Sequence, residues 1–448
     1  RQGQVNLTSA PDNRGATVEN VYFKTFYWLS GGLSWYTNHK IYAGIRDAYL
    51  YTGNPKAKKV FLSFCDWACW VTEKLTDHAF ARMLYSEHGA MNEMLTDAYA
   101  FSGERKYLDC AFRFNEQETM VPCIDGDIKK IAETISHTHA NAQIPQFYGL
   151  IKEFEYTGDS LFKVAAENFF KYVTNYQSFV TGGNSEWEQF RAPGNIMAQV
   201  TRRSGETCNT YNMLKIAKGL FELTGDTLYL NYMERALYNG VLSGMALDGK
   251  SFFYVNPLES LPEACHKDER KFHVKPVRQK WFGCACCPPN IARLLSSIAS
   301  YAYTEAEDAL YVHLYMGSVL EKDCGGKKLD IRISSDFPWD GKVMAEINAE
   351  EPVACRLAFR IPGWCSSYTL NGQKGLEEGE TVTADGETRQ VKDGYLIIDR
   401  VWNGGEKLEL DFPMEVRLMQ ADARVREDIG KAAVTRGPIV YCMEEADN

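Results

Sequence analysis

Tyr156-Thr157-Gly158-Asp159 is the stretch that decides the fold, because it ends one helix-periodic segment and starts another. Glycine after a helix supplies the left-handed C-cap, and the acid or asparagine beside it helps to start the next helix. Three other stretches share this form: Tyr51-Thr52-Gly53-Asn54, Phe101-Ser102-Gly103-Glu104 and Leu223-Thr224-Gly225-Asp226. The pattern predicts a series of helical hairpins.

The glycines of these four turns are 50, 55 and 67 residues apart. Repeats of this length that contain two helices are typical of stacked helical hairpins. A fifth hairpin is expected around Asn290–Tyr303. Such hairpins form either an open solenoid or a closed ring, an (α/α)6-type barrel, and the periodicity alone does not choose between them.

Near residue 309 the apolar period changes from about 3.6 to about 2. Alternating runs over Leu310–Tyr315, Lys328–Ile333 and Lys407–Phe412, with glycine and asparagine turns between them, predict an antiparallel β-sandwich. We therefore expect an irregular arm over residues 1–35, a helical domain over 36–308 and a β-sandwich over 309–448. The chain stops just after an apolar strand, so we expect more of the native protein to follow.

Composition excludes two classes of partner. The chain has 49 Lys and Arg against 59 Asp and Glu, whereas nucleic-acid binding needs a concentrated basic surface. No window approaches the ~18 consecutive apolar residues of a membrane span. The 13 cysteines are an odd number in a long chain, which does not indicate a disulfide framework. Most of them, such as Cys65, Cys69 and Cys110, are expected to be packed thiols.

Cys284, Cys286 and Cys287 are the exception, because three cysteines within four positions precede a pair of prolines. Two adjacent thiols are poorly placed for separate disulfides but well suited to one soft metal ion. Glu206 and Cys208 open a predicted helix and are the best candidates to complete the set. Together with Cys286 and Cys287 they predict a four-ligand zinc site, with Cys284 outside it. The alternative is a buried helix thiol and a helix-capping acid.

Four protein ligands leave no position for a catalytic water, so such a zinc site is either structural or supports another chemistry. One alternative makes a ligating thiolate the nucleophile, which then requires a separate proton donor. The loop Thr181–Phe190 offers two glutamates, Glu186 and Glu188, beside Trp187 and Phe190. Burial there would favour a general acid, whereas a solvated loop would carry no chemistry.

Several motifs in this order resemble the β-L-arabinofuranosidases of glycoside hydrolase families 127 and 146. The resemblance covers roughly residues 35 to 445. The motifs that carry it are Tyr36-Thr37-Asn38-His39-Lys40, Glu87-His88-Gly89-Ala90-Met91-Asn92-Glu93, His139-Ala140-Asn141-Ala142-Gln143-Ile144-Pro145, Gly182-Gly183-Asn184-Ser185 with Glu188-Gln189-Phe190, Glu206-Thr207-Cys208-Asn209-Thr210-Tyr211-Asn212, and Cys284-Ala285-Cys286-Cys287-Pro288-Pro289-Asn290.

The resemblance implies an (α/α)6 barrel followed by β-sandwich material, and a retaining mechanism. By that resemblance Cys286 is the nucleophile and Glu188 is the acid/base. The matching glutamate of the family is followed by Gln-Phe, which favours Glu188 over Glu186. Zinc is implied on Glu206, Cys208 and Cys287, with Cys286 as its fourth contact. The residues implied in the sugar pocket are His39, Asn92, Glu93, His139 and Gln143.

The implied function is release of terminal β-L-arabinofuranose from plant-type glycans, with a carbohydrate as the partner. Family resemblance favours a periplasmic or secreted location over the cytoplasm, and the sequence does not indicate an oligomeric state. Two alternatives remain: a sugar epimerase or polysaccharide lyase on the same barrel, and a carbohydrate-binding protein in which zinc only joins two loops. The segment ahead of His39 lacks the helical hairpin expected there, so we expect a barrel open on that side.

Overall fold

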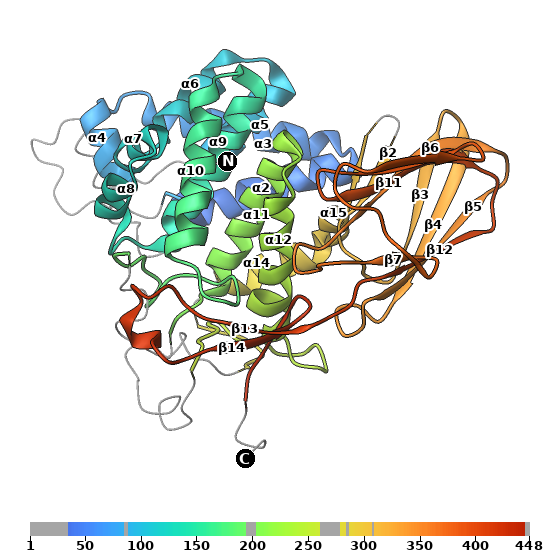
Figure 1. The fold of residues 1–448 in the computed structure, drawn as a ribbon. Coiled ribbons are helices and arrows are strands. Elements are labelled where there is room, and N and C mark those ends of the chain that lie inside the picture. The colour runs from blue at the N-terminus through green and yellow to red at the C-terminus, as the bar shows by residue number, and fades with distance from the viewer. Residues whose placement is uncertain are drawn as a thin grey trace, which may run out of the picture. The chain divides into compact units, whose positions relative to one another are not determined.

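The computed structural model describes residues 35–84, 88–193, 203–259, 278–283, 286–306 and 309–443 (Figure 1). The chain divides into two compact units. The first comprises residues up to Gln177 together with Ser185–Ile196, and the second comprises Ser178–Asn184 and the chain from Met197 onward. Residues 1–34 of the expected N-terminal arm lie outside the described residues, so the hairpin ahead of His39 is not tested.

The described part of the first unit is helical. None of the described helices in the chain combines the length and apolar character that a membrane crossing requires. The helices of this unit are α2 (Trp35–Thr52), α3 (Pro55–Thr72), α4 (Asp77–Leu84), α5 (Met91–Ser102), α6 (Arg105–Arg113), α7 (Gln117–Asp125), α8 (Ile128–Ile135), α9 (Ala140–Thr157) and α10 (Ser160–Tyr176).

The predicted glycine turns join α2 to α3, α5 to α6 and α9 to α10. Gly53, Gly103 and Gly158 all have positive φ, between 67° and 74°, which a side chain with a Cβ disfavours. The Asp159 side chain accepts a hydrogen bond from the Leu161 amide, and Asn54 caps α3 in the same way. The hairpin prediction is therefore confirmed at these turns. The side chain of Glu104, the N-cap residue of α6, makes no capping hydrogen bond.

Aromatic side chains hold the hairpins of the first unit together. Trp35 of α2 meets Phe114 edge to face at a centroid distance of 5.1 Å, and Phe80 of α4 meets the same ring at 5.0 Å. Such pairs add to the apolar area that each ring buries. Cys65 and Cys110 are buried in this core, which confirms the prediction of packed thiols for these two residues.

Glu153 of α9 is a carboxyl group fully buried in the same unit. Its Oε2 accepts a hydrogen bond from Asn115 at 2.7 Å, while its Oε1 has no hydrogen-bond partner in the described part of the chain. Burial raises the pKa of Glu153 to about 8, against a smaller lowering by the Asn115 hydrogen bond. The group is therefore mostly protonated in the folded protein at neutral pH.

Glu153→Gln should stabilise the protein at pH 8 and change little near pH 4. Between the pKa of ~4.3 in the unfolded state and the pKa of about 8 in the folded state, Glu153 is protonated when the protein is folded and ionised when it is unfolded. Stability therefore falls as pH rises through that window, by up to ~1.4 kcal/mol per pH unit. Urea unfolding of both chains at pH 5 and pH 8 measures this. Glu155→Gln, at an exposed position of the same helix, is the control, and equal pH slopes in all three chains would contradict the prediction.

The second unit begins with a helical hairpin and then changes to strands. Its helices are α11 (Thr207–Thr224), α12 (Thr227–Ala236), the π-helical turn η3 (Leu237–Val241), the 3-10 turn η4 (Leu242–Gly244), α14 (Cys287–Ser297) and α15 (Ala299–Ala302). Gly225 turns α11 into α12 with a φ of 71°, as predicted. The fifth hairpin expected over Asn290–Tyr303 is wrong, because helical backbone continues through Ile298 and leads directly into a strand.

Two six-stranded sheets follow, with strand orders β1-β2-β6-β11-β10-β9 and β3-β4-β5-β12-β7-β8. In Figure 1, β3, β4, β5 and β12 run side by side in orange and red. The strand bounds are β1 (Tyr303–Glu305), β2 (Ala309–Val312), β3 (Ser318–Cys324), β4 (Lys327–Ser335), β5 (Lys342–Ala349), β6 (Val353–Arg360), β7 (Thr369–Leu370), β8 (Gln373–Lys374), β9 (Thr381–Ala384), β10 (Glu387–Lys392), β11 (Tyr395–Trp402) and β12 (Glu406–Asp411).

The inward side chains of both sheets form one core, which includes Leu310, Ile331, Phe359 and Leu410. A helical region followed by β-sheets is therefore confirmed. The sandwich is not wholly antiparallel as predicted, because β2 and β6 pair in parallel. The chain leaves β2 for the other sheet and returns to β6 by a crossover rather than a hairpin, which permits a parallel neighbour.

A third, three-stranded sheet was not predicted, although its last strand falls on the apolar run expected near residue 440. The sheet consists of β13 (Val416–Met419), β14 (Ala433–Arg436) and β15 (Ile439–Tyr441), with β14 in the centre. Its strands are only three or four residues long and have no buried positions, so they lack the sustained alternation that marks a half-buried strand.

A buried ion pair joins the helices of the second unit to its sandwich. Arg360 of β6 donates to Glu234 of α12 at 2.5 Å, and both side chains are at most 1% exposed. Trp364 donates its indole N–H to the other Glu234 oxygen at 2.9 Å, and Asn231 accepts from Arg360 at 2.9 Å. The Arg360 Nε–H donates to the His313 carbonyl. Each charged group is thus hydrogen-bonded, as a buried pair requires.

Candidate active site

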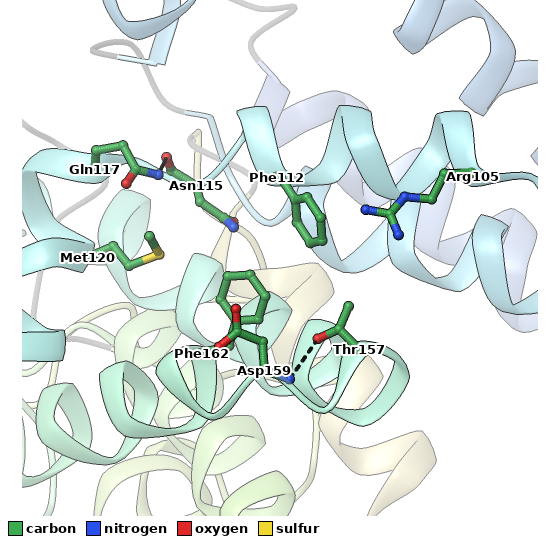
Figure 2. Close-up of a pocket in the computed structure, with 8 residues that line it drawn as sticks. All are labelled: Arg105, Phe112, Asn115, Gln117, Met120, Thr157, Asp159 and Phe162. Carbon is green, nitrogen blue, oxygen red and sulfur yellow. Dashed lines mark hydrogen bonds between the residues drawn. The ribbon is translucent and has the colours of Figure 1, made fainter.

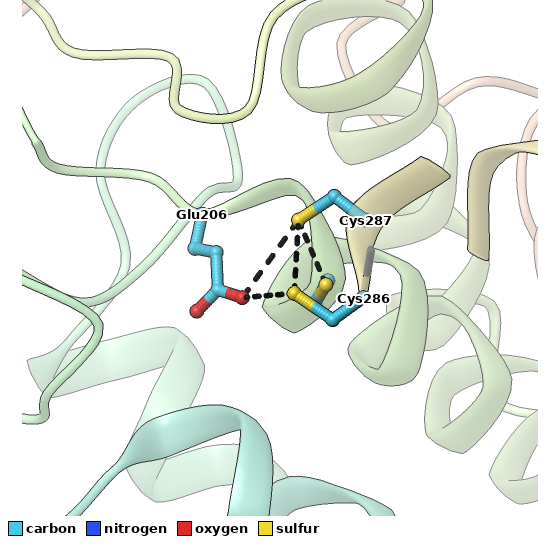
Figure 3. Close-up of side chains that lie close together, drawn as sticks. Glu206, Cys286 and Cys287 are labelled. Atoms are coloured by element: carbon cyan, nitrogen blue, oxygen red, sulfur yellow. Dashed lines mark hydrogen bonds between the residues drawn. The ribbon is translucent and has the colours of Figure 1, made fainter. Parts of the chain in front are cut away.

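The structure brings Glu206, Cys208, Cys286 and Cys287 together in the second unit. Figure 3 shows Glu206, Cys286 and Cys287 of this cluster. One ligand atom from each lies within 4.8 Å of the others. Glu206 Oε1 is 3.9 Å from Cys286 Sγ and 3.8 Å from Cys287 Sγ. The two adjacent sulfurs are 4.0 Å apart, and Cys208 Sγ is 2.8 Å from Cys287 Sγ; none of the three cysteines is in a disulfide. Cys284, expected to stand outside the set, lies outside the described residues.

Local backbone geometry places the first half of this cluster. Glu206 is the N-cap of α11, and Cys208 is in its first turn. Gly205 has a φ of 70°, and a Cβ there would lie 2.8 Å from the Asn256 carbonyl oxygen. Only glycine fits, since both the conformation and the close approach exclude a side chain. Glu206 then pairs with Val255 in an antiparallel bridge.

The second half comes from the start of α14. Cys286 is its N-cap and Cys287 its first residue, and proline follows within the first turn. Proline is favoured there because the missing N–H has no helical acceptor and φ is already fixed near the helical value. The two cysteines are thereby held at the end of a rigid element.

Burial raises the pKa of the Cys208 and Cys287 thiols well above the ordinary value, and it outweighs the lowering that a hydrogen bond from a neighbouring thiol causes in each. Thiolates at such a site therefore need a positive charge beside them. Three sulfurs and one carboxylate, all within reach of a common point, match the ligand types and the number of a closed zinc site. The residues present thus fit the predicted metal, and a metal-binding cluster is supported.

Cys286 differs from the other three members in its exposure. Glu206, Cys208 and Cys287 are fully buried, whereas Cys286 is only half-buried. A small apolar cluster that includes Tyr254, Val255 and Phe282 surrounds the sulfurs. Cys286 is therefore the member of the cluster that keeps exposed surface.

Tyr254 is a member of the site that the sequence did not indicate. Its hydroxyl lies 2.8 Å from Cys286 Sγ, and its carbonyl accepts from the Thr207 amide at 3.1 Å. Burial raises the pKa of Tyr254 well above its usual value, so the hydroxyl keeps its proton and can donate to the sulfur. The segment Phe252–Asn256 has no motif of its own, and only its backbone pairing to the Glu206 loop reveals the role.

Glu188 and Glu186 are both buried, at 8% and 2% exposure, so the alternative of a solvated acidic loop is wrong. Trp187 and Glu188 have φ values of 53° and 66°, which residues with side chains rarely adopt. The Glu188 carbonyl accepts from the Ala140 amide at 2.8 Å. A ring nitrogen of His139 and a Glu188 carboxylate oxygen lie within 4.8 Å of each other.

His39 and Glu93, two of the predicted pocket residues, contact each other in the first unit. His39 Nε2 is 3.2 Å from Glu93 Oε2, and the other Glu93 oxygen accepts from Arg46 at 3.0 Å. Arg46 also donates to Asp97 at 2.6 Å. The structure therefore holds Glu93 between a histidine and an arginine, which fixes its carboxylate.

Asn92 and Gln143 belong to a network between helices. The Asn92 amide donates to Asn115 and to the Gln146 carbonyl, both at 2.9 Å. Gln146 in turn donates to Gln143 at 3.0 Å. A Cβ on Gly149 would meet the Asn92 oxygen at 2.1 Å, so glycine makes room for this amide. His139 is the N-cap of α9 rather than a helical residue, and the Gln143 amide bonds to its carbonyl.

The first unit also contains a cavity of about 430 Å³ (Figure 2). Phe112 and Phe162 stack at a centroid distance of 5.5 Å in its wall. The predicted site residues do not line it. Its lining residues are Arg105, Phe112, Asn115, Gln117, Met120, Thr157, Asp159 and Phe162.

Comparison with known families gives three consecutive matches. Residues 13–300 match the beta-L-arabinofuranosidase GH127 catalytic domain, residues 309–414 the GH127 middle domain, and residues 416–448 the glycoside hydrolase family 127 C-terminal domain. A curated non-reducing end beta-L-arabinofuranosidase of Bifidobacterium longum subsp. longum is 35% identical over 306 residues. That match covers 65% of this chain and 43% of the relative, so the matched region spans less than half of the relative's length.

Two solved structures extend the likeness to most of the chain. The GH127 beta-L-arabinofuranosidase Ara127N of Geobacillus stearothermophilus T6 is 28% identical with a TM-score of 0.64, over 97% of this chain and 82% of that one. The GH127 beta-arabinofuranosidase BT3674 is 28% identical with a TM-score of 0.73, over 98% and 67%. With a catalytic-domain match over more than half of its residues, this chain belongs to glycoside hydrolase family 127.

Proposed function

We propose that this protein is a retaining, exo-acting β-L-arabinofuranosidase that releases terminal β-L-arabinofuranose from plant-type glycans. The observation that carries the proposal is a half-buried Cys286 beside three fully buried ligand residues. A purely structural site would be expected to bury all its ligand residues alike. One ligand cysteine that keeps exposed surface suits a nucleophile.

In the first step, the Cys286 sulfur attacks the anomeric carbon of the sugar and a carbon–sulfur bond forms. The bond from that carbon to the leaving oxygen breaks, and the Glu188 carboxyl group gives its proton to this oxygen. The hydroxyl of Tyr254, 2.8 Å from the sulfur, orients the nucleophile. Zinc held by Glu206, Cys208, Cys286 and Cys287 would supply the positive charge that keeps these thiols deprotonated at neutral pH.

In the second step, the Glu188 carboxylate takes a proton from water, whose oxygen attacks the same carbon. The carbon–sulfur bond breaks and the cysteine is released. Two displacements at one carbon retain its configuration, as in glycosidases that use a carboxylate nucleophile. A thiolate takes the place of that carboxylate here.

We further propose that the sugar is held by the residues that the resemblance implies: His39, Asn92, Glu93, His139 and Gln143. The contacts of Glu93 with His39 and Arg46 support a fixed carboxylate for sugar hydroxyls. Asn92 would act from within the network between α5 and α9. The proposal includes closure of the helical hairpins into an (α/α)6 barrel and a domain division after residue 308.

A panel of p-nitrophenyl arabinofuranosides of both anomers and both hands tests the assignment. We expect nitrophenol release from the β-L compound alone, with β-configured sugar as the first product by proton NMR. Prolonged treatment with a zinc chelator should remove the activity, and added zinc should restore it. Release from an α-L or D-sugar instead, or an inverted product, would contradict the proposal.

Glu188→Gln should lower turnover of natural-type glycans by about 10²–10⁴-fold, because the leaving oxygen loses its proton donor. The p-nitrophenyl sugar should still react in the first step, since its leaving group needs no proton. Added azide, which needs no general base, should then restore turnover of that substrate. Glu186→Gln is the matched control two residues away and should keep most of the activity. Loss in the Glu186 variant with full activity in the Glu188 variant would reverse the assignment.

A further inference from the structure

Asn239 is a buried amide whose hydrogen-bonding groups are all engaged. It lies in the π-helical turn η3, which directly follows α12, and is 5% exposed. Its Nδ2 donates to the Arg235 and Pro438 carbonyls, each at 2.8 Å, and its Oδ1 accepts from the Val440 amide at 2.8 Å. Single π-helical turns are rare and are frequently found at functional sites.

The partners on one side belong to the three-stranded sheet. Val440 is in β15, an edge strand of that sheet, and Pro438 directly precedes this strand. Within the described part of the chain, no strand pairs with the outer side of β15. The Asn239 side chain supplies one donor and one acceptor to this edge, much as a further strand would. The sheet is therefore fastened to η3 through one amide.

The partner on the other side leads to the cysteine–glutamate cluster. The backbone carbonyl of Asn239 accepts from Asn256 Nδ2 at 2.6 Å. The Asn256 backbone amide donates to the Gly205 carbonyl at 3.0 Å. Gly205 directly precedes Glu206, and its Cα leaves no room for a side chain against Asn256.

This path continues through the residues next to Asn256. Val255 pairs with Glu206, and the Tyr254 carbonyl accepts from Thr207. The position of Asn256 thus sets two members of the site at once: the Glu206 carboxylate and the Tyr254 hydroxyl beside Cys286. All of these residues lie in the second unit.

We infer that Asn239 is a positioning residue, through which the C-terminal sheet β13–β15 holds the Glu206 loop in the geometry that binds metal. The inference rests on the proposed function in that it takes the cluster to be a zinc site. Partners behind metal ligands typically change metal affinity by 10–100-fold when they are removed. Asn239 acts through Asn256 and Gly205, and it touches no ligand itself.

The test compares Asn239→Ala with Asn231→Ala. Asn231 is a matched control two turns earlier on the same helical run, and its amide also joins this run to a β-segment, through Arg360 and Gly363. Zinc affinity is measured by competition with a chromophoric chelator, and the melting temperature alongside it. Both variants should melt at lower temperature, but only Asn239→Ala should bind zinc 10–100-fold more weakly. The visible absorption spectrum of cobalt-loaded Asn239→Ala should also differ from that of the cobalt-loaded natural chain, because this spectrum depends on the geometry of the ligands.

Val440→Pro provides a second variant for the case in which Asn239→Ala does not fold. It removes the N–H that donates to Asn239 Oδ1, on an edge strand where proline is tolerated. Weaker zinc binding in this variant would support the inference from the sheet side. If Asn239→Ala and Val440→Pro both bind zinc as tightly as Asn231→Ala does, this inference is overturned and the proposed metal site is not. A natural chain without zinc affinity would overturn both this inference and the proposed metal site.

Discussion

Cys286→Ser should reduce release of β-L-arabinofuranose by at least about a thousandfold, with circular dichroism and melting temperature close to those of the natural chain. A serine hydroxyl is a far weaker nucleophile than a thiolate and stays protonated at neutral pH. The fold should survive because Cys286 is the half-buried member of the cluster and lies at the start of α14, as its N-cap, rather than inside a core.

Metal content separates loss of the nucleophile from loss of a ligand. Zinc in Cys286→Ser should be measured directly, and activity compared at equal zinc occupancy. Cys69→Ser, at a half-buried thiol of the first unit, is the control for cysteine replacement as such. Full activity in Cys286→Ser would exclude the thiolate mechanism and favour an epimerase or lyase, whose acid–base groups need no sulfur. Glycan binding without turnover in the natural chain would instead favour a carbohydrate-binding protein.

A covalent intermediate gives an independent measure. Glu188→Gln forms the intermediate but resolves it slowly, so it should gain the mass of one anhydropentose when mixed with the p-nitrophenyl sugar. Peptide mapping should place that mass on Cys286. The double variant with Cys286→Ser should gain none. If the added mass is instead found on a carboxylate side chain, that residue and not Cys286 is the nucleophile.

Glu234→Ala should destabilise the second unit by about 3–5 kcal/mol, because it leaves the Arg360 guanidinium buried without a counter-charge. Burial raises the pKa of Glu234, and Arg360 opposes that rise by favouring the charged form. The Trp364 indole N–H would lose its acceptor as well. A lower urea midpoint, followed by far-ultraviolet circular dichroism, measures the effect.

The paired change tests whether the charge itself is the cause. Glu234→Leu combined with Arg360→Met removes both charges at similar volume, and should recover most of the lost stability. A surface pair such as Glu346 and Lys407, 2.8 Å apart on neighbouring strands, is the control. Glu346→Ala should change the stability little, since exposed pairs contribute little. Equal losses in Glu234→Ala and Glu346→Ala would contradict the argument.

Local signals predicted the helices and their turns well. The glycines at 53, 103, 158 and 225 all adopt positive φ where the sequence placed a C-cap. This works because a C-cap depends on a few neighbouring residues and on the absence of a Cβ. The continuous helix through Ile298 shows the converse, since no glycine or proline separates Asn290 from Tyr303 to end it.

Long-range placement was predicted only where chemistry restricted it. Cys208 and Cys286 are 78 residues apart in the sequence. Their proximity could still be predicted, because adjacent cysteines with a Glu-x-Cys pair are best explained by a shared metal ion, and the structure brings the four residues together. Tyr254 was missed because an aromatic residue within an apolar segment is ordinarily a core residue. The strand β15 was expected from its apolar run, but its pairing into a third sheet was missed, because β13 and β14 are short and have no buried alternating positions.

The 2.8 Å between the sulfurs of Cys208 and Cys287 has a practical consequence for preparing the protein. If the metal is stripped in air, dioxygen can take two electrons and two protons from this pair and leave a cross-link between α11 and α14. That cross-link removes two of the four ligands at once. Activity lost in this way would return after a thiol reductant followed by zinc, and not after zinc alone. Storage of the protein with both zinc and reductant should therefore preserve its specific activity.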